Sequence, residues 1–245
     1  MPIHKRRLDL ALKEGGFFAS TDEAMRAVMA GKVFVNGQKS TKPGSPVVPD
    51  DVLSLAIENK YVGRGGLKLE AGLDAFGIDL NGLVCADIGA STGGFTDCLL
   101  QQGAAWVYAI DVGHGQLAWR LRDHPRVECR EKTNARFLKK ADFDIEPQLA
   151  VGDVSFISLT QILPAVFGIL PPNAEMVFLL KPQFEAARWE VGEGGVVRDA
   201  DVRDRCLKKV QEFVIASGHE WVGSIASPIT GRDGNVEFLI HCRRS

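Results

Sequence analysis

The sequence lacks any apolar run that could cross a membrane, which needs about 18 to 20 consecutive apolar residues. Its longest apolar stretches, such as 165–170 and 175–180, have the length of one strand or a short helix. The basic start, with Lys5, Arg6 and Arg7, is followed by no apolar segment of the kind that a secretory signal contains. We therefore expect a protein of the cytoplasm that does not enter membranes.

The sequence is also poor in cysteine, with five residues, none of them in a C-x-x-C pair. An odd number of widely spaced cysteines predicts neither a disulfide framework nor a zinc knuckle, so we expect reduced thiols and no metal. The 45% share of hydrophobic residues in 245 positions suffices for a sizeable core and excludes disorder as the dominant state. This length fits one large domain, or an ordinary domain with a small one.

Charge is close to balance, with 29 basic and 31 acidic residues, but it is unevenly distributed. The first 48 residues carry eight Lys or Arg and four acids, whereas the remainder has a net charge of −6. This asymmetry is typical of a polyanion-binding appendage on a catalytic or structural body. A surface with randomly placed charges explains the numbers equally well, so charge alone decides nothing.

The first sixty residues predict a small domain of two helices and a twisted sheet. One short helix ends near Gly15-Gly16, and Ser20 with Glu23 forms a capping box that opens a second helix, which stops at Gly31. A strand at 33–35 leads into Asn36-Gly37, a strong hairpin signal. On the stretches RRLD (6–9) and GKVFVNG (31–37), residues 1–59 resemble the S4-like RNA-binding domain.

Residues 60–67 combine three glycines with basic residues, Arg64 among them, and predict a hinge-like linker between domains. An ordinary connector is the alternative. The remaining residues, 68–245, alternate strand-like and helical segments, which predicts an α/β fold with a mostly parallel sheet covered by helices on both faces. The strand-like runs are 83–88, 107–110, 127–129, 149–151, 176–180, 221–225 and 237–242, and the helical stretches are 95–102, 116–122, 159–170 and 201–216.

A glycine-rich turn at 87–97 (DIGASTGGFTD) follows the first strand of this body and opens a helix. A phosphate-binding P-loop would need Gly-Lys-Ser/Thr, and a dinucleotide fingerprint would need glycine where Ser91 stands. The remaining candidate is S-adenosylmethionine, whose amine would pair with a carboxylate such as Asp87. Asp111, at the end of the next strand, can accept hydrogen bonds from ribose hydroxyls. The candidate cofactor residues are Asp87, Gly89, Ala90, Ser91, Thr92, Gly93, Gly94, Phe95, Asp111 and Asn134. Ordinary helix-capping acids are the alternative for both aspartates.

Polar residues also stand at the ends of later strands. Asp153 ends the strand at 149–151, and Lys181 closes an apolar strand, where lysine is unusual unless it is paired. Glu237 begins the last strand and would share their edge if that strand runs antiparallel to the rest. Lys68 enters the body just after the glycine-rich segment. The sequence alone does not bring these four residues together.

Six ordered motifs carry a resemblance that covers essentially the whole chain. They are GRGGLKL (63–69), DIGASTGGFTD (87–97), DVGHGQL (111–117), DVSFISL (153–159), KPQFE (181–185) and GGVVRD (194–199). The body resembles the FtsJ-type 2′-O-methyltransferases, and the full chain is similar to the hemolysin A (TlyA) family of ribosomal RNA 2′-O-methyltransferases. The resemblance implies a Rossmann-like, S-adenosylmethionine-dependent enzyme whose catalytic tetrad falls on Lys68, Asp153, Lys181 and Glu237.

The resemblance also implies a substrate, namely a cytidine ribose of large-subunit rRNA and, in some members, a second cytidine in small-subunit rRNA. The N-terminal domain would then hold RNA through phosphate contacts that weaken with salt. The electrostatic candidates are Arg6, Arg7, Arg26, Lys32, Lys39 and Arg64. His114 stands where the family suggests tyrosine, and we expect it to pack or to form a hydrogen bond. Whether Lys181 is a general base or a steering group, and whether the protein is a monomer or a homodimer, stay open.

Three other functions compete with this interpretation. A non-catalytic ribosome-assembly factor would have no physical need for a lysine at a buried sheet edge. A membrane-active hemolysin, as the family's name suggests, would need an amphipathic or apolar membrane segment, and none is visible. Base methylation usually brings an Asn/Asp-Pro-Pro-aromatic turn or a cysteine nucleophile, whereas this chain has Asp153-Val154-Ser155-Phe156.

Overall fold

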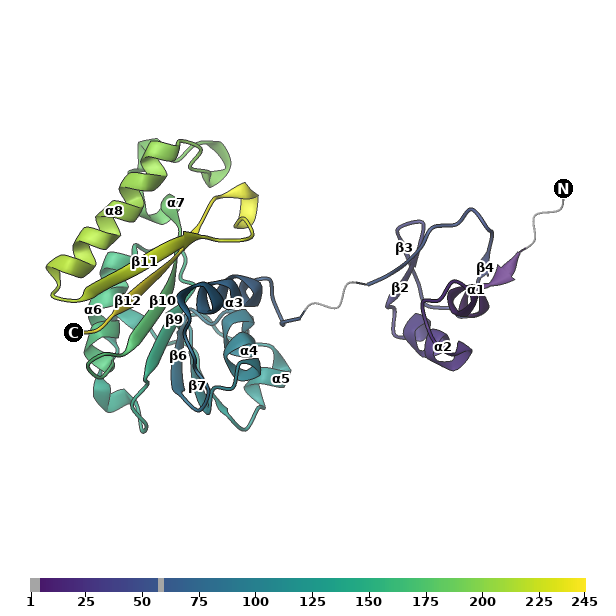
Figure 1. Cartoon of the computed structure of the whole chain (residues 1–245), viewed down its shortest axis with the longest axis horizontal. Coiled ribbons are helices and arrows are strands. Elements are labelled where there is room, and N and C mark those ends of the chain that lie inside the picture. The colour runs from purple at the N-terminus through teal and green to yellow at the C-terminus, as the bar shows by residue number, and fades with distance from the viewer. Residues whose placement is uncertain (1–4, 57–59) are drawn as a thin grey trace. The chain divides into compact units, whose positions relative to one another are not determined.

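The chain forms two units, residues 1–58 and residues 59–245, in the computed structural model. The structure describes residues 5–56 and 60–245 (Figure 1). The predicted domain boundary at residue 59 therefore lies outside the described residues. Each unit has hydrophobic core clusters of its own.

Two short helices, α1 (Leu8–Glu14) and α2 (Thr21–Met29), pack against each other in the first unit. Helix α2 begins where the capping box predicts, because the Ser20 hydroxyl accepts a hydrogen bond from the Glu23 amide at 3.2 Å. Apolar side chains from both helices and two strands form the small core, which contains Leu8, Leu12, Ala24, Ala27, Val28, Val33 and Val47.

Short strands complete the first unit. They are β1 (Arg6–Arg7), β2 (Val33–Val35), β3 (Gln38–Ser40), β4 (Pro46–Val47) and β5 (Leu53–Leu55), with β1 paired to β4 and the others in the order β3-β2-β5. Asn36 and Gly37 join β2 to β3 with φ angles of 50° and 77°. These positive angles are what a two-residue hairpin turn requires, so the predicted hairpin is confirmed.

A seven-stranded sheet forms the centre of the second unit (Figure 1). Its strands are β6 (Val84–Ile88), β7 (Trp106–Ile110), β8 (Val127–Arg130), β9 (Leu149–Gly152), β10 (Glu175–Leu180), β11 (Glu220–Ala226) and β12 (Phe238–Arg243). The order across the sheet is β11-β12-β10-β9-β6-β7-β8, and β12 runs antiparallel to both of its neighbours. Each strand lies within about one residue of its predicted bounds, and the antiparallel direction that the position of Glu237 required is confirmed.

Helices cover both faces of this sheet, as predicted. Helices α6 (Leu159–Ile169) and α8 (Ala200–Ala216) pack on one face, where alternate strand residues such as Phe178 point. Helices α3 (Gly65–Phe76), α4 (Gly94–Gln101) and α5 (Trp119–Arg122) cover the other face, which holds Val177. Short turns of helix fill the connections: α7 (Pro182–Glu185), η1 (Ala135–Phe137), η2 (Lys140–Asp142), η3 (Arg188–Glu190), η4 (Glu193–Gly195) and η5 (Arg232–Gly234).

The segment predicted as a linker, residues 60–67, belongs to the second unit instead. Tyr61 is buried, and helix α3 begins at Gly65, inside the predicted linker. The glycines serve close packing here, because a Cβ at Gly66 would overlap the Tyr61 ring, and Gly94 of α4 lies against the backbone of residues 63–66. The prediction was wrong because glycines that permit close approach and glycines that permit flexibility look the same in sequence.

The helix expected over 116–122 shortens to Trp119–Arg122. The amides that would start it bond elsewhere: the Gln116 amide donates to Glu131 at 3.2 Å, and the Ala118 amide donates to the Thr92 carbonyl at 3.1 Å. Tertiary hydrogen bonds therefore replace a helical turn at this point. Within the described ranges, no helix has both the length and the apolar character to cross a bilayer.

Two glycine substitutions should separate tight packing from open space. We expect Gly66→Ala to lower the free energy of unfolding by about 1–3 kcal/mol, because the added methyl group must displace the buried Tyr61 ring. Gly168→Ala, in helix α6 with nothing within 4 Å of the new Cβ, should cause no loss. Urea denaturation of both variants measures the difference, and equal stability would contradict the packing role of Gly66.

Candidate active site

The carboxyl ends of β6, β7 and β9 surround a cavity of about 600 Å³. It contains five of the residues singled out from the sequence, namely Gly89, Ser91, Asp111, Asn134 and Asp153. Other lining residues are Gln116 in the loop after β7, Thr133 in the loop after β8, and Ser155 and Phe156 in the loop after β9. A cleft at the carboxyl edge of a parallel sheet is where α/β proteins of this kind bind ligands.

The glycine-rich turn forms one wall of this cavity. Gly89 has a φ of +83°, and a Cβ there would lie 2.9 Å from the Asp153 carbonyl oxygen, so both conformation and space require glycine. Two residues later, the Ser91 amide donates to Asp111 Oδ2 at 2.8 Å, and the Gly113 amide donates to Oδ1 at 2.6 Å. Asp111 therefore fastens two loops together, and its oxygens retain lone pairs that can accept further donors.

Six candidate cofactor residues lie outside the cavity lining, five of them in the turn after β6. Ala90 and Phe95 are buried in the core, Gly94 packs against the segment before α3, and Gly93 begins helix α4 with a φ of +98°. The Thr92 carbonyl accepts from the Ala118 amide. These residues shape the turn, while Gly89 and Ser91 line the cavity. Asn134 lines it as well, and its side chain accepts a hydrogen bond from the Arg136 amide at 3.1 Å.

Asp87 also lies outside the lining and is completely buried at the end of β6. Its Oδ2 accepts a hydrogen bond from the Thr96 hydroxyl at 2.6 Å, but its Oδ1 has no partner among the described residues. Burial raises the pKa of this carboxyl to about 7. A buried carboxylate oxygen without a donor is costly, and a cation beside it would remove the cost.

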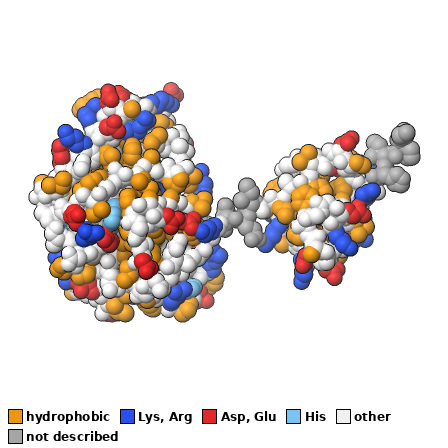
Figure 2. Space-filling model, in the orientation of Figure 1, with side chains coloured by type: hydrophobic (Ala, Val, Ile, Leu, Met, Phe, Trp, Pro, Cys, Tyr) orange, Lys and Arg blue, Asp and Glu red, His pale blue; other side chains and the backbone are white. Residues whose placement is uncertain are grey.

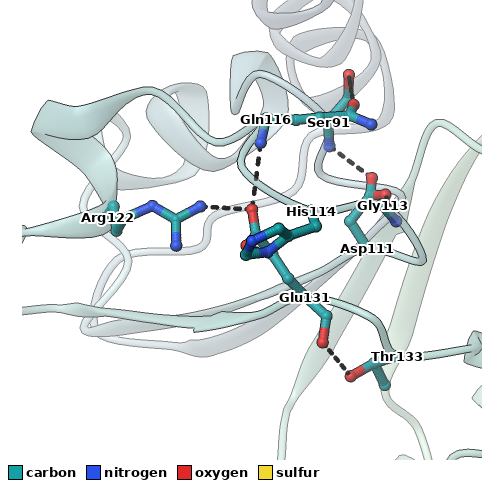
Figure 3. A network of polar contacts seen from close by, with 8 residues as sticks. All are labelled: Ser91, Asp111, Gly113, His114, Gln116, Arg122, Glu131 and Thr133. Carbon is teal, nitrogen blue, oxygen red and sulfur yellow. Dashed lines mark hydrogen bonds and ion pairs between the residues drawn. The ribbon is translucent and has the colours of Figure 1, made fainter.

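A second carboxylate at this edge, Glu131, was missed by the sequence analysis. It follows β8 and lies between Arg122 and His114 (Figure 3), with His114 Nδ1 at 2.9 Å from Oε2. The backbone N–H of Gly115 and the Arg122 guanidinium lower the pKa of Glu131 to about 2. Its place directly after a strand was the available signal. The hydrogen bond of His114 agrees with the role expected for that residue.

Lys68 and Glu237 form a buried ion pair, with Nζ 2.5 Å from Oε2. They are 169 positions apart in sequence. Helix α3 carries Lys68, and Glu237 directly precedes β12, so the antiparallel strand brings the carboxylate back to the carboxyl edge of the sheet. A Cβ on Gly231 would overlap the Glu237 carboxylate, so the loop before β12 also encloses this group.

Lys181 and Asp153 form a second ion pair at 2.7 Å, and Lys181 Nζ also donates to Ser155 Oγ at 2.7 Å. The two pairs share one edge, because Leu180 is paired with Phe238 across β10 and β12, directly before Lys181 and directly after Glu237. A Cβ on Gly65, one turn before Lys68 on α3, would lie 3.8 Å from Asp153 Oδ2. The structure thus gathers two amines and two carboxylates beside the cavity.

Phe156 is a further feature that sequence reasoning missed. Its side chain lines the cavity, is 91% exposed, and has a φ of +64°, which is uncommon for a bulky residue. Its ring packs against Phe184, with the ring centroids 5.2 Å apart. An exposed ring on a strained loop beside a cavity indicates a contact surface for a ligand. The polar residues around it in sequence gave no signal for this exposure.

Comparison with known proteins places the chain in a family. Residues 61–244 match the FtsJ-like methyltransferase family, and residues 6–53 match the S4 domain. The chain belongs to the FtsJ-like methyltransferases. The predicted Rossmann-like methyltransferase fold, with its N-terminal S4 domain, is thereby confirmed.

Several relatives of this methyltransferase span nearly the whole chain. It is 47% identical to YqxC of Bacillus subtilis, over 98% of this chain and 86% of the relative. Identity is 44% to the Hemolysin A of Brachyspira hyodysenteriae, over 96% and 98%. It is 43% to the 16S/23S rRNA (cytidine-2′-O)-methyltransferase TlyA of Mycobacterium tuberculosis, over 98% and 90%.

Solved structures resemble the methyltransferase as well. A structure from Streptococcus thermophilus with a hemolysin name is 43% identical and covers 99% of this chain and 90% of its own, with a TM-score of 0.76. An S-adenosylmethionine-dependent methyltransferase from Mesorhizobium loti is 17% identical over 74% of this chain and 100% of its own. Its TM-score of 0.54 shows a shared fold alone.

The candidate RNA-binding residues of the methyltransferase differ in what they contact. Arg6 pairs with Glu14 at 2.5 Å, and Arg7 pairs at 2.6 Å with Asp9, which is fully buried. All six candidates are exposed, including Arg26, Lys32, Lys39 and Arg64. Figure 2 shows basic side chains of the first unit interspersed with acidic and apolar ones. Over residues 5–56 and 60–245, no group of His, Cys, Asp and Glu is arranged to hold a metal ion.

The buried Asp87 should make the stability of the methyltransferase depend on pH. Its pKa of about 7 in the folded state lies above the ordinary 3.8, so its stabilising contribution is complete below about pH 4 and is lost as the pH rises through 7. We expect Asp87→Asn to gain about 4 kcal/mol relative to the wild type between those limits. Urea denaturation at pH 4, 5, 6 and 7 measures this gain.

Asp204→Asn is the matched control, because Asp204 is an exposed residue of helix α8. Its unfolding free energy should follow that of the wild type at every pH. A constant difference between Asp87→Asn and the wild type across this range would show that Asp87 does not titrate near 7.

Proposed function

We propose that this protein uses S-adenosylmethionine to methylate the ribose 2′-oxygen of a cytidine in ribosomal RNA, with large-subunit rRNA as the first substrate to test and small-subunit rRNA as the second. The observation that carries the proposal is the pair of ion pairs, Lys68–Glu237 and Lys181–Asp153, at the edge of the cavity. The names of the TlyA relatives, which state rRNA cytidine 2′-O-methylation, support the same reaction. A ribosomal substrate places this reaction in the cytoplasm.

The residues around the cavity fit the proposed cofactor. When bound, S-adenosylmethionine would supply a methyl group that is activated by the positive charge on sulfur. Asp87 has an unpaired buried oxygen for the cofactor's amine, and Asp111 has lone pairs for its ribose hydroxyls. Gly89 allows the backbone to approach closely, and Ser91 and Asn134 line the space for the nucleoside.

The side chains at the sheet edge suit a reaction that consists mainly of alignment. Lys181 would orient the 2′-oxygen and, as a deprotonated amine, accept the proton that this oxygen loses when it takes up the methyl group. Asp153 and Ser155 hold the Lys181 nitrogen in place. Lys68 and Glu237 are both buried and form an ion pair, so neither leaves an unpaired charge. They place one positive and one negative group at the carboxyl edge of the sheet. We assign the four residues to the catalytic site on this basis.

The exposed Phe156 ring offers a surface on which a nucleobase can stack, which the charged side chains do not. Sequence-specific RNA enzymes commonly splay the target base out of its helix and stack it on an aromatic side chain. Phe156 lies on the segment that carries Asp153 and Ser155, so a base stacked on it would bring its ribose near Lys181. The requirement for a 2′-hydroxyl selects RNA over DNA.

Lys181→Ala should abolish methyl transfer and leave cofactor binding within about threefold of the wild type, because the amine acts on the RNA hydroxyl. Asp153→Ala should behave in the same way, whereas Asp111→Ala should lose the cofactor. The measurements are transfer of tritium from labelled S-adenosylmethionine to purified 50S and 30S subunits, and cofactor affinity by calorimetry. Lys208→Ala, an exposed lysine on α8, is the control and should keep full activity.

Mapping of 2′-O-methyl groups on the labelled rRNA then identifies the nucleotide. Substantial residual transfer by Lys181→Ala would reject its assigned role. A wild-type protein that binds subunits without modifying either one would favour a non-catalytic assembly factor.

The S4 domain should bind RNA through exposed basic residues. We expect the double variant Arg26→Ala, Lys39→Ala to weaken RNA binding and to reduce the slope of log K against log salt by about 2, because two phosphate contacts are lost. Filter binding between 50 and 300 mM salt measures the slope. Lys13→Ala, an exposed residue of α1 outside the candidate set, is the comparison, and an unchanged slope in the double variant would remove both residues from the RNA contact.

A further inference from the structure

A buried carboxylate outside the four-residue group connects two of the segments that form the candidate site. Glu185 is the last residue of α7, and its side chain is 1% exposed. Its Oε1 accepts from the Leu159 amide at 2.6 Å, and its Oε2 accepts from the Ser158 hydroxyl at 2.6 Å and from Lys209 at 3.1 Å. Three groups therefore satisfy the carboxylate: the first amide of α6, the Ser158 hydroxyl and the Lys209 ammonium on α8.

The contacts of Glu185 continue a series that joins the loop after β9 to the segment after β10. Lys181 contacts Asp153 and Ser155, and the Phe184 ring contacts that of Phe156. Glu185 then binds Ser158 and the first amide of α6. Residues further along the segment after β10 contact residues further along the loop after β9. The two segments are therefore held together along their length.

Glu185 is the best-shielded member of this series. Phe156 is 91% exposed, and the Lys181–Ser155 hydrogen bond lies at the surface, so solvent competes for both contacts. The Glu185 hydrogen bonds to Leu159 are buried, and a charged acceptor makes hydrogen bonds roughly twice as strong as neutral ones. The strained backbone of Phe156 also needs surroundings that fix it, and the residues after it are the ones that Glu185 holds.

We propose that Glu185 is a positioning residue for methyl transfer, which holds residues 153–158 in register with Lys181. The inference rests on the proposed function, since it assigns the task of placing Asp153, Ser155 and Phe156 to a group that touches neither the cavity nor the reacting atoms. Removing the carboxylate frees the Ser158 end of the loop, and the Lys181 amine and the Phe156 ring then lose their fixed separation.

Two variants test this role with the full-length protein and ribosomal subunits. Glu185→Ala should lower kcat roughly 10- to 100-fold, the loss expected when reacting groups are misplaced by about 1 Å. The KM for RNA and the Kd for S-adenosylmethionine should stay within about threefold. Ser158→Ala removes the hydroxyl's hydrogen bond to Glu185 and its N-cap bond to the Thr160 amide, but it leaves the carboxylate paired with Leu159 and Lys209. We expect kcat to fall about three- to tenfold.

The stoichiometry of S-adenosylmethionine binding separates positioning from misfolding. If each variant binds close to one cofactor per chain, the protein is folded and the lower kcat reflects misplaced groups. A stoichiometry that falls in proportion to kcat would overturn the proposal in favour of a structural role. Glu185→Gln keeps an oxygen for the Leu159 amide and should recover part of the activity lost in Glu185→Ala. Equal activity of Glu185→Ala and the wild type would also overturn it.

Glu190→Gln is the matched control. Glu190 lies five positions further along the chain, pairs with Arg205, and accepts a hydrogen bond from the Ala187 amide at 3.0 Å. Among the described residues, it forms no hydrogen bond or ion pair with the loop after β9. It should keep wild-type kcat, and a loss equal to that of Glu185→Gln would overturn the specific role of Glu185. If the wild type itself transfers no methyl group, the proposed function fails first, and that outcome is distinct from a Glu185 variant that matches an active wild type.

Discussion

The antiparallel pairing of β12 with β10 is the constraint on which the rest of the site depends. In a wholly parallel sheet, the start of the last strand would lie at the opposite edge from the ends of the others. Because β12 is reversed, Glu237 arrives beside Lys181, and the register between Leu180 and Phe238 fixes their neighbourhood. One strand direction therefore supplies the partner that allows Lys68 to be buried as a charged group.

Close approach between backbones is the second requirement. Lys68 reaches the sheet edge only because α3 starts against the beginning of α4, where Gly65 and Gly66 meet Gly94 and Tyr61 packs beneath them. Asp97 strengthens this contact, since it accepts a hydrogen bond from the Val62 amide at 2.8 Å and pairs with Arg120. The glycines thus couple the segment after the first unit to the glycine-rich turn of the cavity.

The sequence predicts the sheet well because buried strands leave continuous apolar runs, and it predicts the hairpin at Asn36-Gly37 because only a few residue types tolerate both positive φ angles. It also singles out Lys181, since an amine that closes an apolar strand needs a partner.

The sequence does not predict a residue's role where that role depends on tertiary contacts. The glycines at 63–66 could equally be flexible, and nothing near Phe156 in sequence distinguishes an exposed ring from a buried one. Glu185 follows an apolar strand by only a few residues, but its proposed role depends on contacts with Ser158, Leu159 and Lys209. Sequence spacing does not reveal these contacts.

Glu131 and Asp87, at the same sheet edge, have pKa values that their surroundings shift in opposite directions. Glu131 receives hydrogen bonds from a peptide amide and Arg122, so its pKa falls to about 2 and its charge is already compensated. Asp87 is fully buried, which raises its pKa to about 7 despite its one hydroxyl donor, and its Oδ1 has no partner in the part of the chain that the structure describes. A ligand cation gains little from a carboxylate of the first kind and much from one of the second, because only the second is destabilised until a positive group arrives. The buried carboxylate of Asp87 therefore suits the amine of the proposed cofactor, whereas the charge of Glu131 is already used to hold His114 and Arg122.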